Sequence, residues 1–144
     1  MTMPTIPLHS AVQKSLDDTK VNYVRLGTSG LRVSVPMLGC MSFGSKEWSP
    51  HPNAQWVIEE EDSLKVLKAA YDMGIATWVT ANIYSNGMSE EIIGKAIKKF
   101  QIPRQKLIIM TKCHNYVGEK PDIFSAYMVG GMVRSKDYVN RGGE

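Results

Sequence analysis

Apolar positions in the central part of the chain follow two different spacings, which predict alternating strands and helices. Short apolar runs predict strands at 37–42, 75–80 and 106–111. Apolar residues three or four positions apart predict helices at 59–73 and 89–100, and Gly74 is a typical stop for the first helix. This order of elements predicts a parallel sheet covered by helices, which is an α/β fold.

Both predicted helices carry charges and apolar stripes that suit their positions. The acidic run from Glu59 to Asp62 lies at the positive end of a helix dipole, which explains it better than metal binding does. The buried stripe expected for this helix contains Leu64, Val66, Leu67, Ala69, Ala70, Tyr71 and Met73. Ser89 is expected to cap the second helix. The apolar face of that helix contains Ile92, Ile93, Ala96, Ile97 and Phe100.

The residues before the first parallel strand predict a β-hairpin. Residues 23–26 and 31–35 are strand-like and flank the turn Gly27-Thr28-Ser29-Gly30. The second strand alternates apolar and polar residues, which indicates one buried and one solvated face. We therefore expect the hairpin to lie as a flap across the end of a larger body. After the first parallel strand, residues 46–57 are expected to form an ordered loop.

Length and composition indicate one soluble globular domain. The chain has 144 residues, of which 43% are hydrophobic and 22% charged. We expect residues 1–20 to form a flexible N-terminal tail and residues 21–144 to form one domain, with no element predicted after residue 117. A net charge of +3, without a stripe of basic and aromatic residues, argues against a nucleic-acid partner.

Cysteine content and the lack of long apolar runs predict the cellular location. Cys40 and Cys113 provide no disulfide framework, and Cys113-His114 is too sparse for a metal site, so we expect reduced thiols and no metal. No apolar run is long enough to span a membrane, and residues 1–20 lack a signal-peptide pattern. The sequence therefore predicts a cytoplasmic protein without a membrane partner.

Two side chains capable of acid–base chemistry follow neighbouring strands of the predicted sheet. Tyr84 lies in the polar loop after the strand at 75–80, and Lys112 follows the strand at 106–111. The carboxyl ends of parallel strands meet at one edge, where α/β proteins carry their chemistry, so both side chains should lie there. An ammonium group beside a phenol favours the phenolate and makes the phenol a better proton donor to a carbonyl near neutral pH. The alternative, a packing tyrosine and a solvated lysine, stays open at this point.

Several ordered motifs resemble those of the aldo-keto reductase family, in particular its fungal norsolorinic-acid-reductase-like and aryl-alcohol-dehydrogenase-like branch. The matching stretches cover roughly residues 21–117. They are Tyr23 to Ser34, Leu38-Gly39-Cys40-Met41-Ser42-Phe43-Gly44, Ala70-Tyr71-Asp72-Met73-Gly74, Thr80-Ala81-Asn82-Ile83-Tyr84-Ser85-Asn86-Gly87, Glu91-Ile92-Ile93-Gly94 and Met110-Thr111-Lys112. Their order and spacing make the resemblance stronger than any one of them alone.

The resemblance implies a (β/α)₈ TIM barrel that uses NADPH to reduce aldehydes and ketones. Tyr84 would be the general acid that protonates the carbonyl oxygen as hydride reaches the carbon, and Lys112 would make that proton easier to release. Met41, Ser42 and Val79 are the residues expected at the cofactor. The substrate would be a small-molecule carbonyl compound, and the setting would be fungal secondary metabolism such as polyketide tailoring.

The chain departs from the family pattern in two ways. The family has an aspartate that pairs with the lysine, and this chain has Val79 at that position, so we expect slow catalysis. An eight-stranded barrel takes about 250 residues, so the sequence predicts only its N-terminal part, a hairpin plus about three parallel strands. The family's histidine and most of its cofactor-binding loops have no counterpart. The isolated chain is therefore expected to be weak or inactive and not to bind NADPH.

Non-enzymatic functions remain as alternatives. The chain could be a remnant, or a segment that completes or regulates a barrel together with another chain, and an exposed sheet edge favours self-association. Potassium-channel β subunits resemble the same family and act as binding partners, and residues 23–34 fit them as well. The stretch from Gly39 to Gly44 resembles the fungal reductases more closely, so the channel subunit ranks last.

Overall fold

A computed structural model describes residues 21–48, 56–113 and 117–118, together with Ser10, Lys14 and Asp18. Apart from these three positions, the predicted tail at 1–20 lies outside the described residues, as do most of the predicted loop at 46–57 and residues 119–144. The elements are β1 (Asn22–Arg25), β2 (Arg32–Val35), β3 (Leu38–Gly39), η1 (Lys46–Trp48), α2 (Glu60–Asp72), β4 (Thr77–Val79), η2 (Tyr84–Gly87), α3 (Met88–Lys99), η3 (Arg104–Lys106) and β5 (Ile108–Met110).

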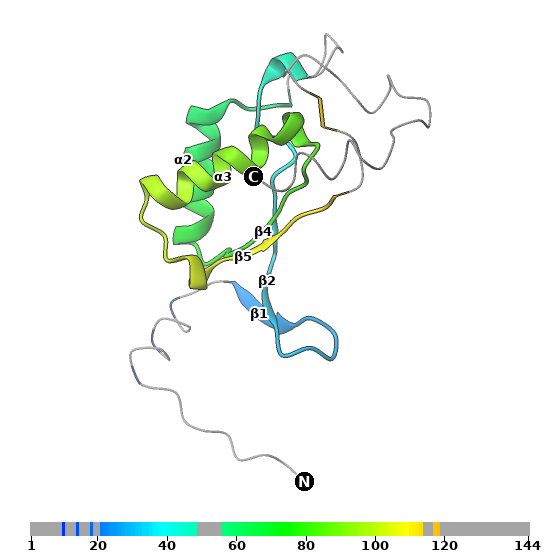
Figure 1. Ribbon diagram of the computed structural model, residues 1–144. Helices are drawn as coiled ribbons and strands as arrows, with labels where there is room; N and C mark the ends of the chain where they lie inside the picture. The colour runs from blue at the N-terminus through cyan, green and yellow to red at the C-terminus, as the bar shows by residue number, and fades with distance from the viewer. Residues whose placement is uncertain are drawn as a thin grey trace.

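The strands form the two sheets that the sequence predicted. β1 and β2 pair antiparallel as a hairpin, and β3, β4 and β5 form a parallel sheet in that order. Val79 at the end of β4 lies between Gly39 of β3 and Met110 of β5. The described residues form no closed barrel (Figure 1). The predicted hairpin and three parallel strands of an incomplete α/β barrel are confirmed.

The parallel strands are shorter than the apolar runs that predicted them. β4 begins only at Thr77 because the preceding residues end α2. Gly74, with a φ of 87°, donates its N–H to the carbonyl of Tyr71 at 2.9 Å, and Ile75 donates to Ala70 at 2.8 Å. This pair of bonds is a Schellman motif, which glycine favours because it adopts positive φ without a steric penalty. Gly74 is therefore the helix stop that the sequence predicted.

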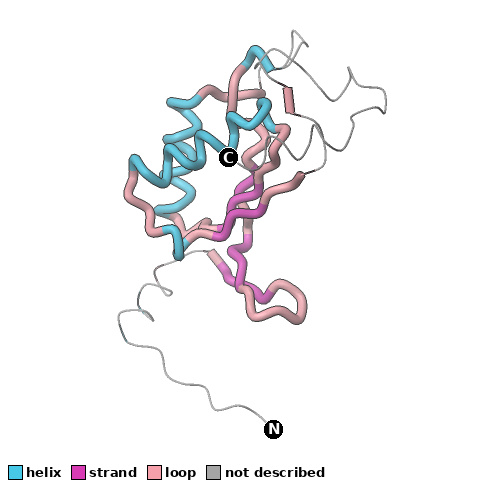
Figure 2. The backbone as a smooth tube through the Cα atoms, in the orientation of Figure 1, coloured by secondary structure: helices cyan, strands magenta, loops and turns pink. Residues whose placement is uncertain are grey.

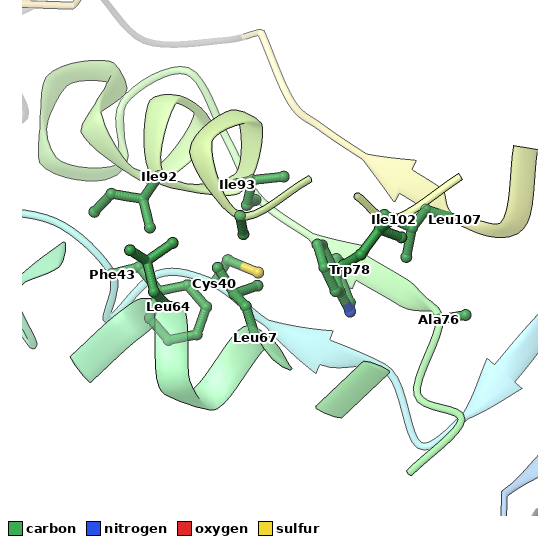
Figure 3. Packing of buried hydrophobic residues seen from close by; sticks show 11 residues of the cluster. Cys40, Phe43, Leu64, Leu67, Ala76, Trp78, Ile92, Ile93, Ile102 and Leu107 are labelled. Atoms are coloured by element: carbon green, nitrogen blue, oxygen red, sulfur yellow. The ribbon is translucent and has the colours of Figure 1, made fainter. Parts of the chain in front are cut away.

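α2 and α3 cover one face of the parallel sheet (Figures 1 and 2). The core between them consists of Cys40, Phe43, Leu64, Leu67, Ala76, Trp78, Ile92, Ile93, Ala96, Ile102 and Leu107. Figure 3 shows side chains of α2, α3 and the sheet meeting there, with the Cys40 sulfur among them. Val66 and Met73 are 39% and 57% exposed, so the stripe predicted for α2 was too wide. Only one side of this helix packs on the core.

The hairpin is attached to the parallel sheet and α2 by side-chain hydrogen bonds. The backbone N–H of Ser34 donates to Thr77 Oγ1 at 2.8 Å, and the N–H of Thr77 donates to Ser34 Oγ at 3.0 Å. Tyr23 donates its hydroxyl to the carbonyl of Gly74 at 2.6 Å. Burial raises the pKa of the Tyr23 phenol, so this donor stays protonated. The hairpin thus crosses the amino-terminal side of β4, away from the edge where Tyr84 and Lys112 lie.

Candidate active site

The carboxyl ends of the parallel strands form a continuous edge that extends beyond the regular ladder. Thr80 donates its N–H to the carbonyl of Met110 at 2.8 Å, and Asn82 donates to the carbonyl of Lys112 at 3.0 Å. These bonds keep the two chain segments side by side past the ends of β4 and β5. The loop that carries Tyr84 therefore starts directly beside Lys112.

Tyr84 and Lys112 are in contact at this edge, as the sequence predicted. Lys112 Nζ donates a hydrogen bond of 3.0 Å to the Tyr84 hydroxyl oxygen and lies 4.8 Å from the centroid of its ring. The same nitrogen donates a 2.8 Å bond to the main-chain carbonyl of Thr80. An ammonium group can only donate hydrogen bonds, so the phenol oxygen is the acceptor and its own hydrogen can go to a third group. The arrangement suits a proton donor.

The backbone after Tyr84 adopts an unusual conformation. Ser85 and Asn86 both have left-handed dihedral angles, with φ of 48° and 51°. Left-handed backbone is unfavourable for residues with a side chain, and it persists where surrounding contacts over-determine it. Ser85 is fully buried, and its hydroxyl accepts a 3.3 Å bond from the N–H of Ser45. The loop after β3 thus holds the loop of Tyr84 in place.

Gly44 makes this contact between the two loops possible. A Cβ atom at Gly44 would lie 1.8 Å from Ser85 Oγ and 2.2 Å from Ser85 Cβ, which are impossible separations. Only glycine therefore lets the loop after β3 approach Ser85, the residue next to Tyr84, this closely.

Ser89 has a different role from the predicted one. The N-cap of α3 is Gly87 with a φ of 95°, and no side chain caps the helix. Ser89 lies inside the first turn, where it donates its hydroxyl to the carbonyl of Cys40 at 2.8 Å. Its oxygen is also 2.9 Å from the hydroxyl of Thr80. The prediction of a serine cap was wrong because Gly87 adopts the left-handed conformation that starts the helix two residues earlier.

Met41, Ser42 and Val79 lie at the same edge as Tyr84 and Lys112. Residues on the helix-covered face of the sheet are Leu38, Cys40, Trp78 and Ile109. Side chains alternate between faces along a strand, so Val79 and Met110 point to the opposite face, as does Lys112 two positions later. Met41 follows β3 and is 47% exposed, and the carbonyl of Ser42 accepts a 2.7 Å bond from the N–H of Ile58. Among the described residues, none of these three bonds to the Tyr84–Lys112 pair.

Neither a metal centre nor a membrane-spanning helix is found in the described part of the chain. None of its His, Cys, Asp and Glu residues form a group of three or more that could hold a metal ion. Its helices are all too short or too polar to cross a bilayer. Burial raises the pKa of the Cys40 thiol to about 12, so this thiol behaves as a core residue. Cys113 is exposed, and no disulfide joins the two.

Known proteins are similar to this chain over most of its length. A family model described as "Aldo/keto reductase family" matches residues 37–136. The chain belongs to this family. It is 48% identical over 138 residues to the aldo-keto reductase dtxS3 of Metarhizium robertsii, and the aligned region covers 92% of this chain and 36% of that protein. It is 47% identical over 123 residues to the versiconal hemiacetal acetate reductase of Aspergillus parasiticus, and the aligned region covers 85% of this chain and 34% of that protein.

A solved aldo-keto reductase has a similar fold. The holo form of AKR11C1 from Bacillus halodurans aligns with a TM-score of 0.53 and 29% identity, over 69% of this chain and 28% of that chain. The predicted family, its fungal branch and the predicted fold class are therefore confirmed. The chain spans about a third of the length of the curated relatives it matches.

Proposed function

We propose that this aldo/keto reductase chain carries the proton-donating part of a site that reduces the carbonyl group of an aldehyde or ketone with NADPH. The observation that supports the proposal most is the 3.0 Å hydrogen bond from Lys112 Nζ to the Tyr84 hydroxyl at the carboxyl edge of the parallel sheet. A setting in fungal secondary metabolism is supported by the similarity to a versiconal hemiacetal acetate reductase.

Tyr84 acts as the general acid in the proposed reaction. Its hydroxyl proton moves to the carbonyl oxygen while hydride adds to the carbonyl carbon, which converts the C=O group into an alcohol. The O–H bond of Tyr84 breaks in this step, and the phenolate that remains is stabilised by the Lys112 ammonium group 3.0 Å away. Water returns a proton to the phenolate before the next turnover.

The side chains at the edge fit the nicotinamide end of such a cofactor. Val79 is half-buried on the same sheet face as Lys112, and Met41 is 47% exposed, so both offer apolar surface to a flat ring. Ser42 follows Met41 and can accept or donate a hydrogen bond. Met41, Ser42 and Val79 would hold the ring, which supplies the hydride when it is bound. The choice of NADPH over NADH rests on the family likeness.

The Val79 side chain contributes to the slow turnover that we expect. The Val79 side chain has no charged or polar atom, and the Lys112 ammonium is held by the neutral carbonyl of Thr80, directly after β4, at 2.8 Å. A carboxylate would add the Coulombic attraction of an opposite charge, which a neutral carbonyl does not provide. The lysine is therefore oriented less firmly than a carboxylate at this position would orient it.

An assay of carbonyl-dependent NADPH oxidation tests the proposal. The purified chain is mixed with NADPH and a panel of aromatic and aliphatic aldehydes and ketones, and NADPH is followed by its absorbance. NADPH is supplied in large excess, because the isolated chain lacks most of the family's cofactor-binding loops and is not expected to bind it tightly. Under that excess we expect slow oxidation that requires the carbonyl compound and is lost in Tyr84→Phe. No carbonyl-dependent oxidation with any compound, or equal rates in the parent and Tyr84→Phe, would contradict the proposed reaction.

A second candidate function is the completion or regulation of a barrel formed with another chain. Large apolar side chains are exposed on the hairpin and next to β3, namely Val24, Leu26, Leu31, Val35, Met37 and Met41. Exposed apolar surface of this kind marks contacts with other proteins. Light scattering after size-exclusion chromatography distinguishes the candidates, because a compact monomer with one cooperative melt disfavours the barrel-completing segment. Micromolar NADPH binding in a fluorescence titration would favour the reductase and would overturn the expectation that the isolated chain does not bind NADPH.

A further inference from the structure

The first turn of α3 joins three strand ends at the candidate site. Ser89 donates to the carbonyl of Cys40, which follows β3, at 2.8 Å. The same hydroxyl lies 2.9 Å from that of Thr80, which follows β4. Glu90 accepts a 2.6 Å bond from the hydroxyl of Thr111, which follows β5. One helical turn therefore contacts the chain beyond all three parallel strands.

The bond between Thr80 and Ser89 has a defined direction. A serine hydroxyl has one hydrogen, and that of Ser89 goes to the carbonyl of Cys40, so Thr80 is the donor to Ser89. Both side chains are buried, with 1% of Thr80 and none of Ser89 exposed. Breaking such a bond leaves a polar group unpaired in apolar surroundings, so the two hydroxyls fix the local conformation.

Thr80 links these buried hydroxyls to Lys112. Its hydroxyl is held by Ser89, its N–H donates to Met110 at 2.8 Å, and its carbonyl accepts the 2.8 Å bond from Lys112 Nζ. All three polar groups of this residue are therefore in use. The neighbouring Val79 has no polar side-chain atom, and the Thr80 carbonyl directly after β4 is the oxygen that accepts from the ammonium group.

The loop that carries Tyr84 begins and ends at this hydroxyl pair. Thr80 precedes the loop, Ser89 follows it in the first turn of α3, and their side chains are bonded to each other. The pair thus closes the base of the loop. Any movement of the Thr80 carbonyl would move the Lys112 anchor and the start of the Tyr84 loop together.

We propose that Thr80 and Ser89 are positioning residues for the Tyr84–Lys112 pair, because their buried hydroxyls fix the carbonyl that holds Lys112 Nζ against the Tyr84 phenol. The catalytic consequence rests on the proposed function. The anchoring of Lys112 is a property of the fold and can be measured without turnover.

Exchange of the Lys112 ammonium protons with water measures the anchoring directly. The full chain is labelled with nitrogen-15 lysine, and the Lys112 signal is assigned by its loss in Lys112→Arg. Thr80→Val removes the donor hydroxyl, and Thr80→Ser retains it. Ser89→Ala is compared with Ser63→Ala, because Ser63 is also fully buried and donates to the carbonyl of Ile58 at 3.0 Å, at the start of α2.

We expect the Lys112 protons to exchange about fivefold faster in Thr80→Val and Ser89→Ala, the factor by which one typical hydrogen bond shifts a local equilibrium. Thr80→Ser and Ser63→Ala should retain the parent rate. Equal exchange within either matched pair would overturn the proposal. If Ser89→Ala does not give a folded protein by its thermal melt, the Thr80 pair decides, because both Thr80 variants keep the bond from Ser89 to Cys40.

Steady-state kinetics of the same variants test the catalytic consequence. In Thr80→Val, kcat should fall about fivefold with little change in KM, because the lost hydrogen bond affects orientation and not substrate contact. Ser63→Ala should keep the parent kcat. A chain that reduces no carbonyl compound would count against the proposed function alone, since the exchange comparison still decides the positioning role.

Discussion

The two faces of the parallel sheet differ in packing and in chemistry. The packed face, toward α2 and α3, carries Cys40 and Trp78, both fully buried in the apolar core. The opposite, open face carries the half-buried Val79 and, beyond the strand end, the exposed Lys112. Residues of both faces alternate along the same strands, so one short segment serves both. Stability and chemistry can therefore be changed separately through neighbouring residues of one strand.

The largest effect is expected for Tyr84→Phe, which removes one oxygen from the open face. General acid catalysis contributes about 10²- to 10⁴-fold, so kcat should fall by that range. The thermal melt should change little, because Tyr84 is not part of the core cluster. Tyr71→Phe in α2 is the matched control and should retain the parent kcat. A similar loss of kcat in both variants would show that the hydroxyl of Tyr84 has no special role.

Trp78→Ala changes the packed face of the same strand. Removing a fully buried tryptophan is expected to destabilise the chain by about 3–5 kcal/mol. Trp56→Ala serves as the control, because Trp56 is 45% exposed and its removal should lower the free energy of unfolding much less. Urea unfolding followed by circular dichroism measures both. The idea of a packed face would fail if the two variants had the same midpoint.

Cys40 gives the packed face a pH dependence. Burial raises the pKa of this thiol from 9.0 to about 12, so the unfolded chain releases the proton first as the pH rises. Stability from Cys40 is fully present below pH 9 and is lost progressively as the pH rises from about 9 toward about 12. Unfolding midpoints at pH 8 and pH 10 should differ more in the parent than in Cys40→Ala.

Alkylation by iodoacetamide compares the buried Cys40 with the exposed Cys113. Cys113 is exposed and should react in the folded chain, whereas Cys40 should react only after unfolding. Peptide mass spectrometry identifies the modified residue. Rapid modification of Cys40 in the folded chain at pH 8 would contradict a closed core on this face.

Val79→Asp is expected to have the smallest effect and sharpens the description of the open face. Val79 is half-buried on the face that carries Lys112, so a carboxylate there can reach the ammonium group. The added ion pair, worth up to about 1 kcal/mol at an exposed site, should raise kcat by up to about fivefold. Val79→Asn has nearly the same shape without the charge and should give a smaller increase. Unchanged kcat in Val79→Asp would mean that Lys112 is already fully oriented by Thr80.

Local patterns predicted much of the fold and the main contact of the candidate site. Helices, hairpin and parallel strands follow from periodicity, and Gly74 follows from the preference of glycine for positive φ. Tyr84 and Lys112 were expected together because parallel strands have their carboxyl ends at one edge, and their side chains are 3.0 Å apart. These features depend on residues close in sequence or on the direction of strands.

The supports of the Tyr84 loop could not be predicted in the same way. The contact of Gly44 with Ser85 joins two loops about forty residues apart, and no local pattern indicates which glycine meets which side chain. Ser89 matched the preference of serine for helix N-caps, yet Gly87 starts the helix and frees the serine for Thr80 and Cys40. Tertiary contacts decided both positions.

Nuclear Overhauser spectroscopy of the full chain tests the central claim, the contact of Lys112 with the Tyr84 phenol at the sheet edge, most directly. The chain is labelled selectively at lysine and tyrosine, and the two residues are assigned with Lys112→Arg and Tyr84→Phe. A cross-peak between the Lys112 side-chain protons next to Nζ and the Tyr84 ring protons is predicted, because Nζ lies 4.8 Å from the ring centroid. Well-resolved signals of both residues without that cross-peak would contradict the account.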